Sequence, residues 1–409
     1  MAAIPKSLSY FLTRMTGYSR NSTLMRAEGQ DQARPGQTVV VNLPQGIVDL
    51  RTLAMHFKVT TTDATGLLAP KHIETIIQSI VVECGGILVD VCDNAHQIFK
   101  CLADYTTAQD KNNARLYQNG IGVPTANVAT LYTNVPFTIN NFMGFLGSAR
   151  PECIDLSMLP SPFKVYIRLA PLQGGPWVLN KPLATAACTL TDIKFTIDVL
   201  DVGPMYSDMI ARRLQEGPIE IPFQKWFTFT NGATGPAQTT RFAVSSQSVD
   251  LVAGCLLNPD YAAVTASNAS NHVGDTDTSK FFSRLAPASS YFTLNSVRFP
   301  MYDADEPLQF NQTIQALGHL QQDTIGGFDP CLDDTDKYKA HFGLHVIRLN
   351  HQDEAIDQSR LVGGWDTRGT MAAGNWITTG GPNGAFPHVF VACSSTLRVG
   401  QYRQVEIVQ

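Results

Sequence analysis

Alternating apolar and polar residues recur along the chain and predict β-strands rather than long helices. Between Leu53 and Val59, apolar side chains occupy every second position, the pattern of a strand with one buried face. The apolar runs Ile76–Val82 and Ile87–Val91 flank Gly85-Gly86, and two glycines supply the positive φ angles of a tight hairpin turn. Two later strands of this half are predicted at Phe163–Leu169 and Leu190–Val202.

Helical spacing is confined to short segments. Asp93 or Asn94 can cap a helix after the hairpin, with an apolar stripe formed by Ala95, Ile98, Phe99, Leu102 and Tyr105. Residues 203–218 are predicted to be a linker with a short helix, whose shared face consists of Tyr206, Met209, Ile210 and Leu214. A third helical stripe consists of Phe310, Ile314, Leu317 and Leu320.

The residues after 219 again favour strands separated by long loops. The predicted strands are Phe223–Phe229, Arg241–Val244, Ser290–Phe299, Phe342–Leu349, His388–Cys393, Ser395–Val399 and Val405–Val408. The loop-rich stretches are 230–240, 254–289, 322–340 and 350–387. Loops of this length in a compact domain usually carry function or make contacts.

The two halves resemble each other at a spacing of about 210 residues. Ser79–Val82 and Ser296–Phe299 precede their helices at nearly equal distances, and Phe163–Leu169 is similar to Phe342–Leu349. Each half also closes with an alternating strand, at Ile193–Val199 and at Val405–Val408. A duplicated β-domain and chance similarity between two β-domains both remain open.

Composition narrows the class of protein. Of the 409 residues, 44% are hydrophobic, which is enough for buried cores, and only 16% are charged. This length favours two domains. A net charge of -5 argues against a nucleic-acid binder. The low fraction of charged residues is typical of an all-β protein with many loops, or of a protein whose surface is largely covered by neighbours.

The N-terminal segment differs from the rest of the chain. We expect residues 1–36 to form an arm, followed by a first body at 37–202, the linker at 203–218 and a second body at 219–409. Leu8, Phe11, Leu12 and Met15 lie on one face of a short helix, and Arg14 and Arg20 contribute to a basic character. These six residues are the candidate interaction site of the arm, against a neighbouring subunit or a membrane, although packing on its own domain is an equal alternative.

No catalytic motif is readable. The eight cysteines form no CxxC pair and are expected to be reduced and mostly buried, as in proteins made in a cytosol-like compartment. No secretory signal or membrane span is visible, and the chain contains no P-loop, nucleophile elbow or HExxH motif. We therefore predict no catalytic residue, no cofactor, no metal and no small-molecule substrate.

Several polar clusters were weighed as sites. His341, His345 and His351 lie close together, but no acid or thiol completes a metal set within that strand, so ordinary histidines are favoured. The acidic stretch Asp329–Asp336 lacks the EF-hand spacing and is interpreted as a solvated turn rather than a cation bridge. Cys101 lies in a helical pattern without a readable base.

Three segments together resemble a known lineage. They are "ECGGILVD" running into "NAHQIFKCL", "LTDIKFTIDVLDV" leading to Tyr206, and the terminal "SSTLRVGQYRQVEIVQ". With two tandem β-bodies, they are similar to the double jelly-roll major capsid proteins of double-stranded DNA viruses of the adenovirus-like, polinton-like and virophage lineage. The resemblance covers nearly the whole chain after residue 36, and the family has no catalytic residues to carry over.

The resemblance implies a fold and a function. The fold is all-β, with two tandem eight-stranded jelly rolls, short helices and long loops. The function is that of a structural virion protein: a homotrimer, pseudo-hexameric in outline, that tiles an icosahedral capsid beside neighbouring capsomers and minor capsid or penton proteins. The arm is expected to face an internal membrane or the genome, and the protein to be made in the host cytoplasm or nucleus.

A second function stays open. Jelly rolls also serve as lectins and hydrolase modules, and Trp365 and Trp376 are candidates for a sugar-binding platform. The alternative is therefore a carbohydrate-binding or glycan-cleaving β-sandwich protein. An enzyme of that kind needs two carboxylates at a defined separation, and the sequence alone does not pair them.

Overall fold

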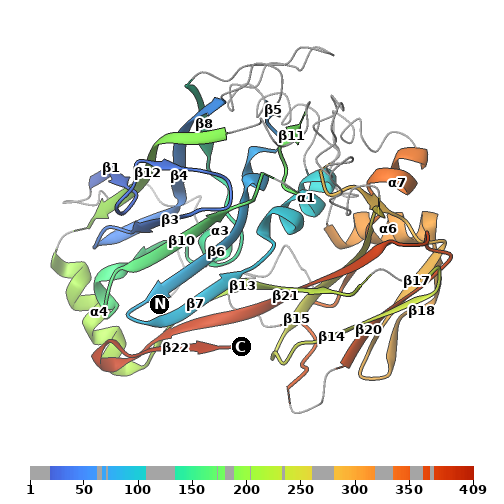
Figure 1. The fold of residues 1–409 in the computed structure, drawn as a ribbon. Helices are drawn as coiled ribbons and strands as arrows, with labels where there is room; N and C mark the ends of the chain where they lie inside the picture. The colour runs from blue at the N-terminus through green and yellow to red at the C-terminus, as the bar shows by residue number, and fades with distance from the viewer. Residues whose placement is uncertain are drawn as a thin grey trace, which may run out of the picture.

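The structure is a computed structural model of the chain. It describes residues 19–61, 67–70, 72–106, 134–172, 174–179, 188–202, 204–232, 235–259, 281–317, 335–350, 363–368 and 373–409. Within these ranges the chain forms two β-bodies that lie side by side, joined by the helix α4 (Pro204–Glu216) (Figure 1).

The first body consists of two antiparallel sheets. One follows the order β1 (Ser19–Arg26), β12 (Cys188–Asp201), β4 (Ile47–Thr61) and β8 (Val135–Ile139), with β2 (Gln32–Ala33) on β12 and β9 (Cys153–Asp155) on β4. The other follows the order β3 (Thr38–Asn42), β10 (Phe163–Leu169), β6 (Ile77–Cys84) and β7 (Ile87–Cys92). A small separate sheet pairs β5 (Leu67–Leu68) with β11 (Val178–Leu179).

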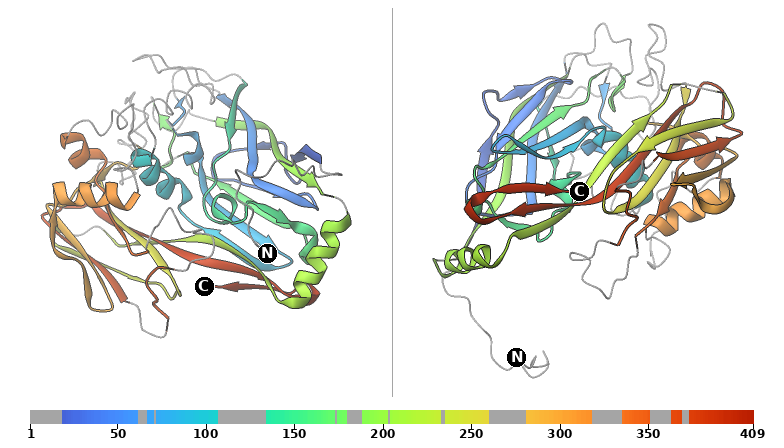
Figure 2. Two further views of the ribbon diagram at one scale, coloured as in Figure 1. Left: turned by 180° about the vertical axis from the view of Figure 1, so that it is seen from behind. Right: turned by 90° about the horizontal axis from the view of Figure 1, so that it is seen from below.

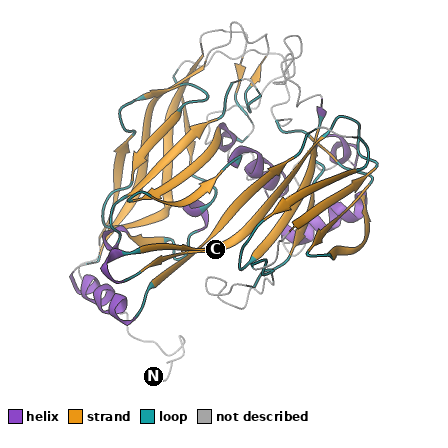
Figure 3. Cartoon of the chain, turned by 60° about the horizontal axis from the view of Figure 1, so that its bottom comes forward, coloured by secondary structure: helices purple, strands orange, loops and turns teal. Residues whose placement is uncertain are grey.

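The second body repeats this arrangement (Figure 3). Its first sheet follows the order β13 (Ile219–Thr230), β21 (Phe386–Val399) and β15 (Val249–Leu257), with β16 (Arg284–Leu285) and β19 (His345–Arg348) on β15 and β22 (Val405–Val408) on β21. Its second sheet follows the order β14 (Gln238–Ala243), β20 (Ala373–Thr379), β17 (Ser289–Leu294) and β18 (Val297–Asp305).

The two bodies share one strand order, as expected of two tandem jelly rolls. With the main described strands of each body numbered one to eight along the chain, both bodies have one sheet ordered 1-8-3-6 and one ordered 2-7-4-5. The predicted residue matches are wrong, however. The partner of β10 by position is β20 rather than β19, and the partner of β12 is β21 rather than β22. Apolar alternation is common to all half-buried strands, so it does not identify equivalent ones.

The strands with clear alternation are confirmed. The predicted hairpin is β6 and β7, and Gly85 and Gly86 adopt positive φ angles of 58° and 86°. In β12 the odd residues 193, 195 and 197 are buried, and their even neighbours are half-buried. In contrast, the single strand predicted at Ser290–Phe299 is a hairpin of β17 and β18, turned by Asn295 and Ser296 at positive φ.

Three helices occupy predicted segments: α4, and α1 (Ala95–Thr106) and α6 (Glu306–Leu317), which follow the hairpins of the two bodies. In contrast, α7 (Thr335–His341) begins within the stretch 322–340, for which a loop is predicted, so that prediction is wrong there. Three residues of the face predicted for α4, Tyr206, Ile210 and Leu214, are half-buried, whereas Met209 is exposed. Two short 3₁₀ turns, η2 (Ile73–Ile76) and η3 (Leu156–Met158), and a terminal one, η6 (Gln401–Arg403), complete the described helical turns along with α3 (Phe145–Ser148).

Several strands lie in segments for which the sequence predicts an arm or loops. Residues 19–26 form β1, paired along their whole length with β12, so this part of the predicted arm is wrong. Nearly every side chain of β1 is exposed, and an edge strand of this kind carries no apolar alternation. The loops predicted at 254–289 and 350–387 contain the end of β15 and all of β20.

The two bodies share one hydrophobic core. Phe145 of α3 packs edge-on against Phe163 in the first body and Phe223 in the second, with ring centroids 5.2 and 5.1 Å apart. The Arg150 backbone N–H donates to the Pro222 carbonyl across the same contact at 2.9 Å. A second core cluster, built around Phe292 and Trp376, fills the interior of the second body. Apolar side chains of both bodies are therefore buried together at this contact.

Candidate assembly surfaces

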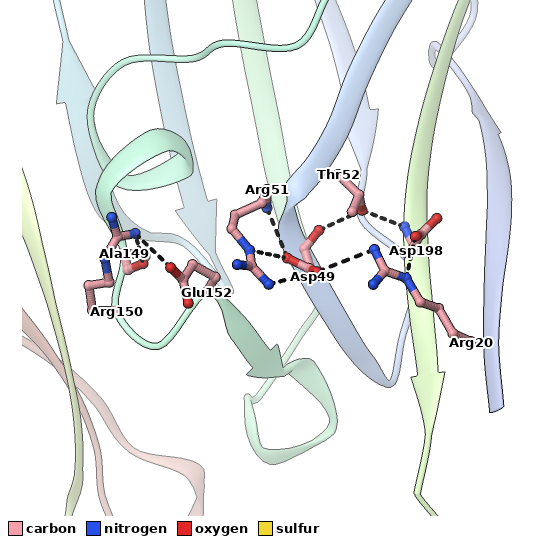
Figure 4. Close-up of polar contacts among 8 residues, drawn as sticks. All are labelled: Arg20, Asp49, Arg51, Thr52, Ala149, Arg150, Glu152 and Asp198. Carbon is pink, nitrogen blue, oxygen red and sulfur yellow. Dashed lines mark hydrogen bonds and ion pairs between the residues drawn. The ribbon is translucent and has the colours of Figure 1, made fainter. Parts of the chain in front are cut away.

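Of the six predicted interaction residues, the structure describes Arg20. It lies in an ionic cluster on β1, β4 and β12 (Figure 4). Its Nε is 2.6 Å from Asp198 Oδ2, and its Nη2 is 3.5 Å from Asp49 Oδ2. Arg51 approaches Asp49 from the other side, with Nε 3.2 Å from Oδ1, and this hydrogen bond raises the pKa of Arg51. Asp49 is thus a buried carboxylate held between two partly exposed guanidinium groups.

Backbone and hydroxyl contacts fix the cluster. Thr52 Oγ1 donates to the Asp49 carbonyl and accepts from the Asp198 N–H, both at 2.8 Å. The Leu50 N–H donates to the Glu152 carbonyl, and Arg150 Nη1 lies 3.5 Å from the Glu152 carboxylate. These contacts occur where the β4–β12 register shifts, between Thr196 and Asp198. The cluster therefore ties β1 to its sheet and presents Arg20 and Arg51 at the surface.

The other predicted arm residues lie outside the described residues. They are Leu8, Phe11, Leu12, Arg14 and Met15. Ser19 pairs with Asp201, close to the start of α4, so the arm segment joins the first body beside that helix.

A buried charge network holds the two bodies together. Asp104 of α1 forms ion pairs with Lys100 of the same helix and with Arg284 of β16. The Nη2 atom of Arg284 is 2.7 Å from Asp104 Oδ2. Burial alone would raise the pKa of Asp104, but the two cations outweigh it and hold that pKa below its ordinary value. Beside them, Tyr105 donates its hydroxyl hydrogen bond to the Phe342 carbonyl of the second body.

Two histidines face the same contact. His96 of α1 stacks on Phe281, and His388 of β21 meets Phe282 edge-on, with ring centroids 5.6 and 5.3 Å apart. Burial lowers the pKa of each imidazole to about 4. Both rings are therefore neutral at pH 7, and their role here is packing.

The polar clusters weighed as sites have structural roles or lie outside the described residues. His345 is buried and hydrogen-bonded to Ser290 Oγ and Gln312 Oε1, both at 2.7 Å, while His341 bonds to Ser283 Oγ at 2.8 Å. The two do not share a strand, because α7 ends at His341. His351 and most of the acidic stretch lie outside the described residues. Within the described ranges, no three His, Cys, Asp or Glu side chains gather as a metal site.

The two tryptophans considered as a sugar-binding platform do not form an exposed aromatic surface. Trp376 of β20 is fully buried and packs against Phe292, with ring centroids 6.2 Å apart. Trp365 is half-buried against Phe299. A lectin-type platform needs an exposed aromatic face, which Trp376 does not offer.

Two hollows lie between described residues, one small and one open. One beneath α1, lined by Glu74, Ile80, Phe99 and neighbours, has room for about 10 Å³, the size of one water. An open one of about 270 Å³ lies between Asn42, Glu83 and Lys164. Among the helices of the described part, none is long and apolar enough to cross a membrane.

Exposed apolar side chains concentrate instead on strand edges and turns. Met301, Tyr302 and Leu308 gather at β18 and the start of α6, where the Tyr302 hydroxyl accepts from Gln312 Nε2 at 2.9 Å. Leu24 is exposed on β1, Ile87 and Leu88 at the start of β7, Met209 on α4, and Tyr402 in the turn between β21 and β22. The sequence analysis missed Leu24, Met301, Tyr302 and Leu308, since exposure of an apolar residue within a strand or helix has no local sequence signal.

Solved structures with the same arrangement identify the architecture. VP54 of PBCV-1, fitted into a reconstruction of the virophage Sputnik, superposes with a TM-score of 0.66 over 98% of this chain and 99% of that chain, at 13% identity. The Faustovirus major capsid protein gives 0.59 over 96% and 92%, at 8% identity. The fold is a double jelly roll. The expected fold class is thereby confirmed.

A third double jelly roll belongs to the Sputnik virophage itself, with a TM-score of 0.53 over 100% of this chain and 92% of that chain, at 11% identity. No protein-family model matches the chain, and no curated protein matches it by sequence. The double jelly roll is therefore recognised through the three-dimensional arrangement of its strands.

Proposed function

We propose that this protein is a structural virion protein, the major capsid protein of a double-stranded DNA virus. The observation that carries the proposal is the likeness to capsid proteins over 98% of this chain and 99% of the other, including both bodies and the linker. The described residues add a buried charge network and a shared core, which connect the two bodies. A building block of a shell needs such a connection and needs no catalysis.

The proposed assembly is a homotrimer. Three copies bring six bodies of the same strand order into one ring with a pseudo-hexagonal outline, and such tiles cover an icosahedral shell. Neighbouring capsomers and minor capsid or penton proteins are the proposed partners, and the virion is the proposed location.

Solution mass tests this proposal. We expect light scattering of the purified chain to give about 134 kDa, three times 44.6 kDa, and negative-stain images of that peak to show hexagonal outlines. A stable species of about 45 kDa at micromolar concentration contradicts the proposal. A melting temperature that rises with an added glycan would instead favour the carbohydrate-binding alternative.

The arm is proposed to act on the inner side of the shell. Its apolar stripe of Leu8, Phe11, Leu12 and Met15, with Arg14 beside it, has the pattern of a short helix that docks on a neighbouring subunit, a membrane or the genome. A chain that begins at Ser19 is expected to form the same trimer but to lose larger assemblies. Phe11→Asp should reproduce the loss, whereas Ser7→Asp, off the stripe, should not. Normal shells from the truncated chain would contradict this role.

A further inference from the structure

The helix α1 of the first body packs against the second body along one side, and Cys101 lies on that side. Asp104 forms an ion pair with Arg284 of β16 at 2.7 Å. The Tyr105 hydroxyl donates to the Phe342 carbonyl. Side chains one helical turn apart share a face, so Cys101 points to the same side as Asp104 and Tyr105. Figures 1 and 2 both show α1 where the two bodies meet.

Cys255 lies on the face of the second body that is turned toward the first. In β15, Ala253 and Cys255 belong to the core that both bodies share, whereas Val252 and Leu256 belong to the second body's own core. Cys255 lies directly opposite His388 of β21, one of the two histidines at the contact between the bodies. The side chain of Cys255 therefore approaches the contact from the second body, as that of Cys101 does from the first.

The thiols of Cys101 and Cys255 meet in this buried site. Cys255 donates a hydrogen bond to the Cys101 sulfur, and both residues are buried. Burial alone would raise the pKa of Cys101, but this hydrogen bond and the neighbouring Arg284 hold that pKa below its ordinary value. Burial and the same hydrogen bond raise the pKa of Cys255. Cys101 is therefore the nucleophile of the pair, and Cys255 is the thiol that reacts with its oxidised form.

We propose that Cys101 and Cys255 are a redox-sensitive pair, which a peroxide converts into a disulfide that joins the two bodies of one chain. The Cys101 thiolate attacks one oxygen of hydrogen peroxide, so that an S–O bond forms, the O–O bond breaks and hydroxide leaves. The Cys255 sulfur then attacks the sulfenic sulfur of Cys101, which forms the S–S bond and breaks the S–O bond. The thiol protons leave with the two oxygens as two waters, so two thiols are oxidised and one peroxide is reduced.

The disulfide makes the contact between the bodies depend on the redox environment. A reducing compartment keeps both thiols free, and the bodies are then held only by packing, hydrogen bonds and ion pairs. An oxidising medium adds a covalent bond across the same contact, which restricts the unfolded chain and stabilises the folded one. Hydrogen peroxide is nearly as small as water, which suits a site that is closed to larger oxidants. The link forms within one chain, so the inference does not rest on the proposed function.

Mass spectrometry of the full chain tests the proposal. The reduced, folded protein is treated with hydrogen peroxide, and a sample kept in dithiothreitol is the reference. We expect the intact mass to fall by about 2 Da, the two hydrogens lost, and the melting temperature to rise by about 5 °C. A digest without reductant should contain one linked pair of peptides, holding Cys101 and Cys255, and dithiothreitol should separate them. Free thiols at both positions, an unlinked sulfinic or sulfonic Cys101, or a link to another cysteine overturns the inference.

Variants separate the pair from the other thiols. Cys101→Ala and Cys255→Ala should each lose the link and the rise in melting temperature. Cys153→Ala, which removes a half-buried thiol of β9, is the matched control and should keep both. Melting of each variant in dithiothreitol shows whether it folds, and the peptide map of the wild type decides the question even where a variant does not.

The unfolded chain gives a second control. In urea the eight cysteines are no longer held in place, so peroxide should link them without preference. The same dominant link between Cys101 and Cys255 in urea would mean that the fold does not select the pair, and the inference would be wrong. Solution mass reports on the proposed function separately. A monomeric chain that still forms the link contradicts the proposed function and supports this inference.

Discussion

Three charged side chains meet at the contact between the bodies, where water is excluded. Asp104 forms ion pairs with both Lys100 and Arg284, and both cations are as deeply buried as the carboxylate. A buried ion pair of this kind contributes little relative to an apolar replacement of the whole network, but removing one partner leaves an uncompensated charge. The network therefore contributes more to the specificity of the contact between the bodies than to the total free energy of unfolding.

Asp104→Ala tests this view of the network. We expect the free energy of unfolding to fall by about 3–5 kcal/mol, because Arg284 and Lys100 lose their common carboxylate in a buried site. Asp303→Ala removes the acid of an exposed pair with Arg298 and should change stability by less than about 1 kcal/mol. Urea unfolding of the two variants measures the difference, and equal effects would contradict the importance assigned to burial.

The buried histidines make stability depend on acidity. The pKa of His388 is lowered by burial to about 4 in the folded chain, below its ordinary value near 6.5. The unfolded chain therefore binds more protons between these values, and stability falls as the pH drops from about 6.5 to about 4. His96 changes stability in the same direction.

His388→Phe isolates one part of this pH dependence. The aromatic ring keeps its place among Phe282 and Phe390, but the site no longer titrates. For each unit by which the pH falls within that window, the ratio of folded to unfolded protein should decrease up to tenfold less in the variant than in wild type. Chemical unfolding at several pH values measures this, and parallel pH profiles for the two proteins would refute the prediction.

At the scale of elements, the second body depends on a close approach of its two sheets. Gly254 in β15 faces the indole of Trp376 in β20, and a Cβ atom there would lie 2.4 Å from Trp376 Cε2. The missing side chain is what allows the largest core residue to fit between the sheets. Sequence inspection placed both residues in loops, because β15 is buried on both faces and shows no alternation.

Gly254→Ala should therefore destabilise the protein by about 1–3 kcal/mol through overpacking against a rigid indole. Gly232→Ala is the matched control, since nothing lies within 4 Å of its added Cβ, and it should be nearly neutral. Thermal unfolding of both variants provides the measurement. A neutral Gly254→Ala would mean that the sheets separate at little cost.

At the scale of the whole molecule, the two bodies should unfold together. Their common core, the Phe145–Phe223 contact and the Asp104–Arg284 pair bury side chains of both bodies at one contact. Calorimetry of the purified chain should therefore show a single unfolding transition rather than one for each body. Two separate transitions would show that the bodies unfold independently.

The sequence by itself determined the elements whose signal is local. Alternation located β4, β10 and β12, paired glycines located the β6–β7 turn, and apolar stripes located α1, α4 and α6. The resemblance of three segments also anticipated the double jelly roll. These signals survive in a linear sequence because each depends on neighbours only a few residues away.

Tertiary structure alone decided the rest. It placed β1 in a sheet, made the equivalent strands of the two bodies recognisable through their order, and buried Trp376 while exposing Met301 and Leu24. Each of these outcomes depends on partners far away in the chain: β1 needs β12, Trp376 needs Gly254, and Asp104 needs Arg284. The hydrophobic pattern along the chain indicates which side chains are apolar enough to be buried. Only the packing of distant strands determines which of them are buried.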